Sequence, residues 1–138
     1  MKKRAFTLVE LLIVVIILGI LAAIVVPQFT EASSDAQMNS LMSNLRVIRG
    51  QIELYKLQHN GTYPELATFT TQMTQKTNPD GTTTGTPTLG PYLQRIPTNP
   101  FSNTNDVTNT AVGSSKAWYY NETTGEFKAN DSAAHAAL

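Results

Sequence analysis

The hydrophobic positions along the chain form two patterns that meet near Pro27. Residues 6–26 are almost entirely apolar, with one acidic residue, Glu10, close to their start. A helix over this stretch would be roughly 31 Å long, and the hydrocarbon core of a bilayer is about 30 Å thick. The stretch therefore predicts a transmembrane helix. A carboxylate in that layer costs about 2.5–3.5 kcal/mol even on lenient insertion scales, so Glu10 is a candidate functional residue that needs a partner.

Beyond Pro27 the apolar residues become periodic. They recur at alternating steps of three and four residues, which places them on one stripe of a helix: Met38, Leu41, Leu45, Ile48, Ile52 and Tyr55. The second half of the helix is therefore predicted to be amphipathic, with this stripe in the core of a small domain. His59, Asn60 and Gly61 are typical of a helix end, and Gly61 suits a left-handed cap.

Two residues weaken the predicted helix. Pro27 removes a backbone hydrogen bond and crowds the preceding turn, and Gly19 costs up to about 1 kcal/mol relative to alanine. We expect the stretch from Gly19 to Pro27 to unwind most readily, which would let a filament extend under force. A kinked membrane helix is an equally compatible interpretation.

After Gly61 the helical rhythm is lost. The segment 61–115 is predicted to be rich in loops, with a tight turn at Pro79-Asp80-Gly81 and polar loop from 103 to 115. Two aromatic-rich runs within 116–129 flank a turn that ends at Gly125, which predicts a β-hairpin. The fold class is therefore α+β: a long N-terminal helix, transmembrane in its first half and amphipathic in its second, packed on a small antiparallel β-sheet.

Composition and charge narrow the location and the partners. The chain has 138 residues, no cysteine and no net charge, so no disulfide staples the domain and no basic face is expected for nucleic acid. The densest basic run, residues 2–4, precedes the span and places the N-terminus in the cytoplasm, with the rest of the chain outside. A cleaved secretory signal peptide and a plain signal anchor are the simple alternatives.

The N-terminal run from Lys2 to Leu12 resembles the signal of type IV pilins and type II secretion pseudopilins. The resemblance implies a leader cut between Ala5 and Phe6, N-methylation of Phe6, and assembly through Thr7 and Glu10. It also implies processing by a prepilin peptidase and methyltransferase, an inner-membrane assembly platform, contact with membrane lipid, and a homopolymer with other pilin-like subunits. The family usually has glycine before the cut, where this chain has Ala5.

Cleavage would give Glu10 a partner. The new amine of Phe6 lies about one helical turn from Glu10, and it can also reach the Glu10 of a neighbouring subunit. Such a pair would offset much of the desolvation cost that either charge has alone. The alternative is a protonated Glu10 that faces lipid.

A second segment, Gly90 to Phe101, resembles the proline-rich passage that follows the helix in major pseudopilins. Together the two segments imply a pilin-like fold and a structural subunit of a type II secretion pseudopilus, which polymerises to drive protein export. A type IV pilus subunit for adhesion, motility or DNA uptake is the alternative, and a membrane-anchored periplasmic binding domain is an alternative of another class. The implied divisions are a leader (1–5), a membrane and assembly helix (6–29), and a periplasmic domain (30–138) with an amphipathic helix at 30–60.

The sequence shows no arrangement typical of an enzyme. His59 and His135 lack metal-ligand spacing and no nucleophile motif is present, so we expect neither catalysis nor a required metal. Major pseudopilins often bind calcium, and the oxygen ligands here would come from Asp106, Glu122 and Asp131. The implied location is the bacterial inner membrane, crossed once, and then a filament in or beyond the envelope.

Overall fold

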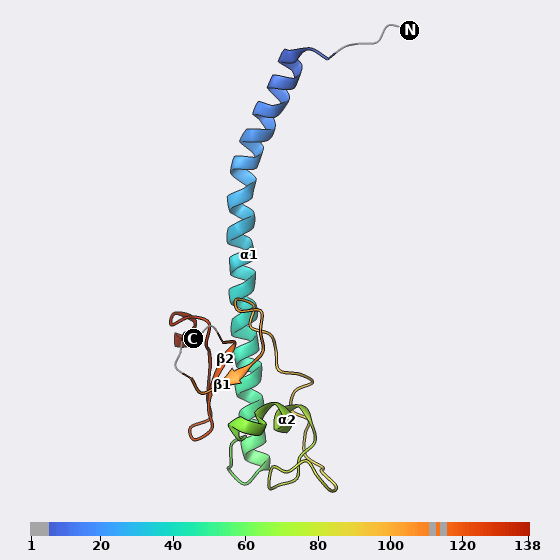
Figure 1. The fold of residues 1–138 in the computed structure, drawn as a ribbon, viewed down its shortest axis with the longest axis vertical. Helices are drawn as coiled ribbons and strands as arrows, with labels where there is room; N and C mark the ends of the chain where they lie inside the picture. The colour runs from blue at the N-terminus through green and yellow to red at the C-terminus, as the bar shows by residue number, and fades with distance from the viewer. Residues whose placement is uncertain (1–5, 111–112, 114–115) are drawn as a thin grey trace, which may run out of the picture. The chain divides into compact units, whose positions relative to one another are not determined.

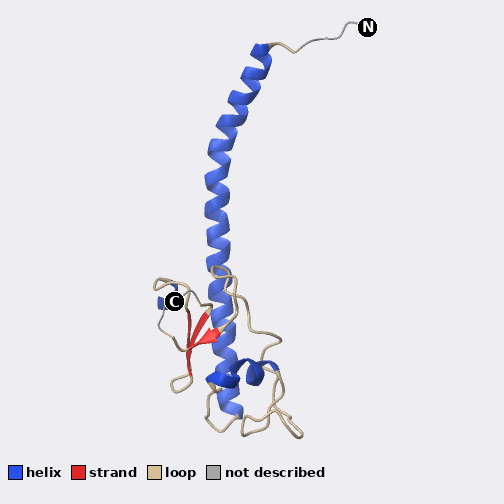
Figure 2. Cartoon of the chain, in the orientation of Figure 1, coloured by secondary structure: helices blue, strands red, loops and turns tan. Residues whose placement is uncertain are grey.

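The computed structural model of the chain describes residues 6–110, 113 and 116–138. It divides into two compact units, Met1–Ala36 and Gln37–Leu138. Figures 1 and 2 show one long helix, short helices and a small sheet. The elements are, in order, α1 (Leu8–Gln58), the 3-10 turn η1 (Leu66–Thr68), α2 (Phe69–Thr74), β1 (Val107–Thr108), β2 (Trp118–Asn121), β3 (Glu126–Ala129) and the 3-10 turn η2 (His135–Ala137).

The helix α1 ends where the sequence predicted it would. The amide of Gly61 donates to the carbonyl of Lys56 at 2.9 Å, a bond that closes a helix C-terminus. Asn60 and Gly61 both have positive φ, of 55° and 85°. The left-handed conformation thus begins one residue before the predicted cap, because asparagine also tolerates it.

The proposed weak points do not interrupt α1 in this structure. The helix is continuous through Gly19 and Pro27. The Thr30 hydroxyl donates to the carbonyl of Val26 at 3.2 Å, beside Pro27. Unwinding between Gly19 and Pro27 therefore stays a prediction about the assembled or stretched state.

The core of the unit Gln37–Leu138 is built on the predicted helical stripe. The stripe residues from Leu41 to Tyr55 are buried, and Met38 is partly buried against them. The sheet contributes Trp118, Tyr120 and Phe127 to the same cluster, and α2 contributes Phe69 and Met73. Burying a large apolar side chain stabilises a fold by about 1.5–3 kcal/mol. The amphipathic half of α1 is therefore one wall of the core, as predicted.

The hairpin is also confirmed. Strands β2 and β3 pair antiparallel, with Trp118 opposite Ala129 and Tyr120 opposite Phe127. Trp118 and Tyr120 are fully buried and Tyr119 is only partly buried, which is the alternation of a strand with one face in the core. The turn closes with a 2.8 Å bond from the amide of Gly125 to the carbonyl of Asn121.

The prediction of a purely antiparallel sheet was wrong in one respect. The sheet has three strands in the order β1-β2-β3, and β1 pairs parallel to β2. Strand β1 is only two residues long and lies in the segment predicted to be polar loop. Asp106 holds it in place, since its carbonyl accepts from the amide of Trp118 at 3.1 Å. Two residues are too few to show any periodicity.

The loop-rich segment covers the core. Tyr92, Leu93 and Ile96 are buried in the extended passage, and the indole N–H of Trp118 donates to the carbonyl of Pro97 at 2.9 Å. The hydroxyl of Tyr120 likewise donates to the carbonyl of Pro64 at 2.8 Å. The aromatic residues of β2 therefore anchor two separate stretches of loop.

Candidate functional site

The start of α1 is a capping box formed by Thr7 and Glu10. The carboxylate oxygen Oε2 of Glu10 accepts from the amide and from the hydroxyl of Thr7, both at 2.8 Å. In return, the hydroxyl oxygen of Thr7 accepts from the amide of Glu10 at 3.2 Å. A threonine followed three residues later by glutamate satisfies two amides that a helix start otherwise leaves without partners.

This geometry gives Glu10 a role in capping its own helix, in addition to the predicted role of pairing with the Phe6 amine. Only Oε2 is engaged within the part of the chain that the structure describes. The group is exposed, and Phe6, the predicted new terminus, is 76% exposed. Ala5 and the rest of the predicted leader lie outside the described residues. Cleavage before Phe6, its N-methylation, and the pairing of its amine with Glu10 all stay predictions.

The apolar half of α1 has nothing packed on it. Every described side chain in residues 6–36 is exposed, including all the large apolar ones between Phe6 and Phe29. One described helix, α1, is long and apolar enough to cross a membrane. An uncovered apolar surface of this length marks an interaction with lipid or with other protein chains.

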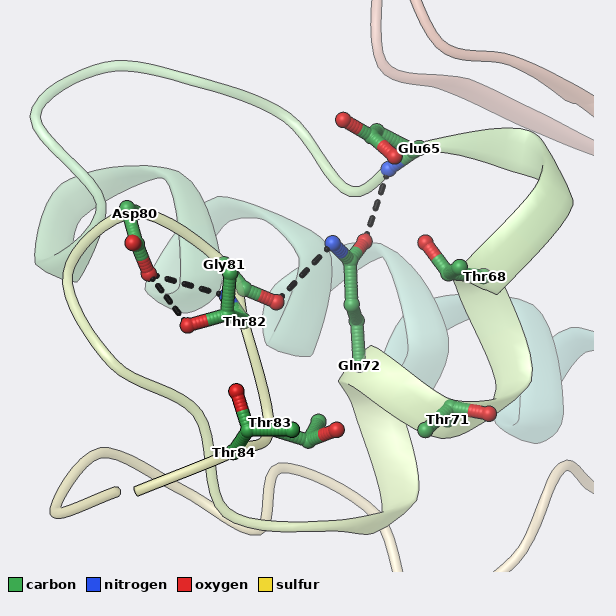
Figure 3. A pocket seen from close by; sticks show the side chains of 9 residues that line it. All are labelled: Glu65, Thr68, Thr71, Gln72, Asp80, Gly81, Thr82, Thr83 and Thr84. Carbon is green, nitrogen blue, oxygen red and sulfur yellow. Dashed lines mark hydrogen bonds between the residues drawn. The ribbon is translucent and has the colours of Figure 1, made fainter. Parts of the chain in front are cut away.

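The unit Gln37–Leu138 carries a pocket of about 300 Å³, lined mainly by residues with polar side chains, between α2 and the turn that follows Asp80 (Figure 3). Gln72 spans it: its side-chain nitrogen donates to the carbonyl of Gly81 at 3.2 Å, and its oxygen accepts from the amide of Glu65 at 2.8 Å. Asp80 accepts from the hydroxyl and amide of Thr82 at 2.7 and 3.0 Å, and these bonds lower its pKa. The bonds of Gln72 and Asp80 hold the predicted turn at Pro79-Asp80-Gly81 against α2.

The three carboxylates considered for calcium have separate partners. Burial opposes ionisation of Asp106, but hydrogen bonds from Thr104 and from the amide of Ala117 outweigh it and lower its pKa. Glu122 accepts from the amide of Leu66 at 2.6 Å. Within the described ranges, no group of three or more acidic, histidine or cysteine side chains is placed to hold a metal ion. Calcium binding stays a prediction.

The third of these carboxylates, Asp131, lies in a network near the C-terminus. It contacts the imidazole of His135, four residues later, and accepts from the side-chain nitrogen of Asn99 at 2.8 Å. The ring of His135 also packs on Phe101, with centroids 4.2 Å apart. This network fixes the C-terminal turn η2 to the loop that contains Asn99.

His59, which the sequence places at the predicted helix end, is a core residue. It is 2% exposed, and its ring stacks on Tyr55 at 3.7 Å. Its Nδ1 lies 2.8 Å from the carbonyl of Tyr55, so this nitrogen carries a proton, and its Nε2 lies 2.9 Å from the hydroxyl of Thr77. His59 follows Tyr55 by four residues and continues the apolar stripe, which is the signal that could have revealed its burial.

An exposed apolar helix with a Thr–Glu cap, continuing into a small α+β unit, defines a pilin-like subunit. A family profile described as the prokaryotic N-terminal methylation motif matches residues 1–26. The type II secretion system core protein G of Pseudomonas aeruginosa is 32% identical over 107 residues, which cover 74% of this chain and 70% of that protein. The protein of the same name from Vibrio cholerae is 32% identical over 103 residues, covering 74% and 68%. The one from Klebsiella pneumoniae is 30% identical over 100 residues, covering 72% and 70%.

This chain belongs to the family of the type II secretion system core protein G. The resemblance to type II secretion pseudopilins is thereby confirmed, and the comparisons favour it over the type IV pilus and the binding-domain alternatives. No solved structure gives a significant match to the chain.

Proposed function

We propose that the chain is a structural subunit of a type II secretion pseudopilus and polymerises through α1. The observation that carries this proposal is the uncovered apolar half of α1, which begins at a capped carboxylate in a chain of this family. Before assembly the subunit crosses the inner membrane once, with its N-terminus in the cytoplasm. The unit Gln37–Leu138 then lies in the periplasm.

The uncovered surface limits where the subunit is stable. Removing apolar area from water releases about 25 cal/mol per Å², so an exposed helix of this kind is stable only in lipid or against other helices. A prepilin peptidase cuts before Phe6 and the amine is methylated. The amine then pairs with Glu10 of a neighbouring subunit, and helices move from lipid into a filament with each apolar surface covered. An inner-membrane platform drives this transfer.

Three variants separate the charge of Glu10 from its capping role. Glu10→Gln keeps a side-chain oxygen that can accept from Thr7 but removes the charge. Thr7→Ala removes both bonds of the hydroxyl but keeps the charge and the bond from the amide of residue 7. Glu10→Ala removes the charge and the two bonds that the carboxylate accepts, but keeps the bond from the amide of residue 10 to the Thr7 hydroxyl. We expect all three to insert in the membrane. Both Glu10 variants should lose filaments, and Thr7→Ala should lose them only in part.

The measurements are membrane fractionation, mass spectrometry of the N-terminal peptide, and the yield of filaments sheared from cells that express the secretion apparatus. A mature terminus at methylated Phe6 supports the proposal. An intact Met1 throughout the membrane fraction, without filaments, would reduce the chain to a simple anchor. Wild-type filament yield from Glu10→Gln would show that the charge has no part in assembly.

A further inference from the structure

The C-terminal segment 130–138 is attached to the sheet although it contains almost no regular structure. It follows β3 directly, and the amide of Asn130 donates to the carbonyl of Ala117, beside β2, at 3.1 Å. The segment ends in the short turn η2. Ala136 is its only buried apolar residue. Apolar burial alone therefore cannot hold the segment in place, and polar contacts must carry much of the attachment.

Asp131 is the centre of these polar contacts, and both of its carboxylate oxygens are engaged. Oδ1 accepts from the side-chain nitrogen of Asn99 at 2.8 Å, and Oδ2 contacts Nδ1 of His135. An ionised carboxylate only accepts hydrogen bonds, so Nδ1 is the donor. The side chain of Asp131 is 9% exposed and that of His135 is 17% exposed. This carboxylate is therefore surrounded by N–H donors of the chain itself.

The oxygens around Asp131 do not fit a calcium ion. Calcium, the metal that the resemblance to pseudopilins implies, takes about six to eight oxygen ligands that converge on one point. The oxygens near Asp131 instead accept from N–H groups. The side-chain oxygen of Asn99 accepts from the amide of Phe101 at 2.9 Å. The carbonyl of Ala117 accepts from the side chain of Asn99 at 3.0 Å and from the amide of Asn130 at 3.1 Å. A cation at this point would have to displace these donors.

His135 joins the C-terminal turn to a loop that is distant in the sequence. Its amide donates to the hydroxyl of Ser132 at 3.2 Å, which fixes it within the turn. Its ring packs on Phe101, with centroids 4.2 Å apart, and its Nδ1 bonds Asp131. Asn99, which bonds the other oxygen of Asp131, belongs to the same loop as Phe101. The imidazole and the carboxylate together thus connect the turn to that loop.

We propose that His135 fastens the C-terminal segment by donating to Asp131, and that this bond takes the place of a calcium ion in this chain. The unit Gln37–Leu138 then folds and keeps its stability without calcium. His135 acts as a positioning residue, since it fixes Asp131 and the turn η2. The inference does not depend on polymerisation, because every contact that supports it lies within one subunit.

Thermal unfolding of the full-length protein in detergent, followed by the fluorescence of Trp118, tests the independence from calcium. The Tm should be the same in excess calcium chloride and in excess EGTA. A calcium site filled at a hundred times its Kd would raise the Tm by at least about 10 °C. A Tm that is more than about 3 °C higher in calcium than in EGTA would overturn the proposal.

Two substitutions of His135 test the bond itself. His135→Ala removes the ring and the donor, and it should lower the Tm by at least about 6 °C, because a hydrogen bond to a charged group is stronger than one between neutral groups. His135→Asn removes the ring but keeps a donor nitrogen at about the position of Nδ1. Its Tm should lie between those of His135→Ala and the wild type.

Lys116→Ala is the matched control. It removes an ion pair with Asp106 at 3.6 Å in the same unit, but both side chains are exposed, so the Tm should change little. A wild-type Tm for His135→Ala, or equal Tm values for His135→Ala and His135→Asn, would overturn the role of the bond. Loss of filaments from the unmodified chain would overturn the proposed function and leave these Tm values unchanged.

Discussion

Asn99 joins the loop-rich segment to the sheet through buried hydrogen bonds, so its substitution should destabilise the unit Gln37–Leu138. Its side chain is fully buried. The side-chain nitrogen donates to the carbonyl of Ala117 at 3.0 Å and to Asp131 at 2.8 Å. The side-chain oxygen accepts from the amide of Phe101 at 2.9 Å. One amide group thus connects its own loop, the start of β2 and the C-terminal network.

The cost of Asn99→Ala follows from which partners keep another bond. The carbonyl of Ala117 still accepts from the amide of Asn130 at 3.1 Å, and Asp131 still contacts His135. Each of these should cost about 0.5–1.5 kcal/mol, the net value of an ordinary hydrogen bond. The amide of Phe101 loses its main partner, which costs about 1–3 kcal/mol. We expect a total destabilisation of about 2–6 kcal/mol.

The assay is thermal unfolding of the full-length protein in detergent, followed by fluorescence. Trp118 is the only tryptophan and is fully buried, so its emission reports on the unit Gln37–Leu138 alone. In a domain of about this size, 1 kcal/mol lowers Tm by about 4–8 °C, so Asn99→Ala should lower Tm by at least about 8 °C. Asn105→Ala, an exposed asparagine in the same loop region, should change it little.

Asn99→Asp sharpens the test. It places a carboxylate against the carbonyl of Ala117 and the carboxylate of Asp131, so it should be worse than Asn99→Ala at pH 7. The repulsion raises the pKa of the new carboxyl in the folded state, and its excess destabilisation should therefore shrink as the pH falls through that pKa. A Tm within about 3 °C of the wild-type value for Asn99→Ala, by the same scaling, would refute the reasoning.

Two further predictions concern the same unit. Gly125→Ala should destabilise it by more than about 1 kcal/mol, because φ is +74° there and the new Cβ would clash with the Tyr63 ring. Gly61→Ala, with φ of +85° and open space, should cost less, and equal Tm losses would contradict the clash. Burial, followed by the charges of Tyr92, Glu65 and Asp80, raises the pKa of Tyr55 to about 12. The unfolded chain therefore loses that proton first, and stability should fall as the pH rises from about 10 to 12. Tyr55→Phe should lessen this fall in a pH series of urea midpoints, and an unchanged alkaline slope would contradict it.

Periodicity made α1 and the hairpin predictable. The stripe from Leu41 to Tyr55 repeats often enough to fix one buried face, and Trp118 and Tyr120 alternate around a turn that ends in glycine. Strand β1 offers no such repetition. Strand β1 forms because β2 pairs with it and because Asp106, next to it, accepts from the amide of Trp118. These contacts join residues that are apart in the sequence, so a local pattern cannot predict them.

Buried polar residues were the least predictable part of the structure. Asn99, His59 and Gln72 resemble surface residues by type. The side chains of Asn99 and Gln72 are each satisfied in the interior by at least two backbone groups, and that of His59 by the carbonyl of Tyr55 and the hydroxyl of Thr77. The positions of the carboxylates considered for calcium were equally hard to predict from the sequence. Asp106 and Glu122 are positioned by backbone amides far away in the sequence, which no spacing rule could indicate.

The capping box changes how the retained acid of the N-terminal signal should be understood. Two hydrogen bonds from Thr7 satisfy one oxygen of Glu10, so the subunit waiting in the membrane has part of its desolvation cost offset by its own chain. Those bonds do not neutralise the charge, because the hydroxyl and the amide are both uncharged donors. A counter-ion therefore still lowers the free energy, and the amine of Phe6 is the cation that processing would create closest to it. Thr7 would thus lower the free energy of the unassembled subunit in the membrane. Pairing of the Glu10 charge with the Phe6 amine would lower the free energy further on assembly.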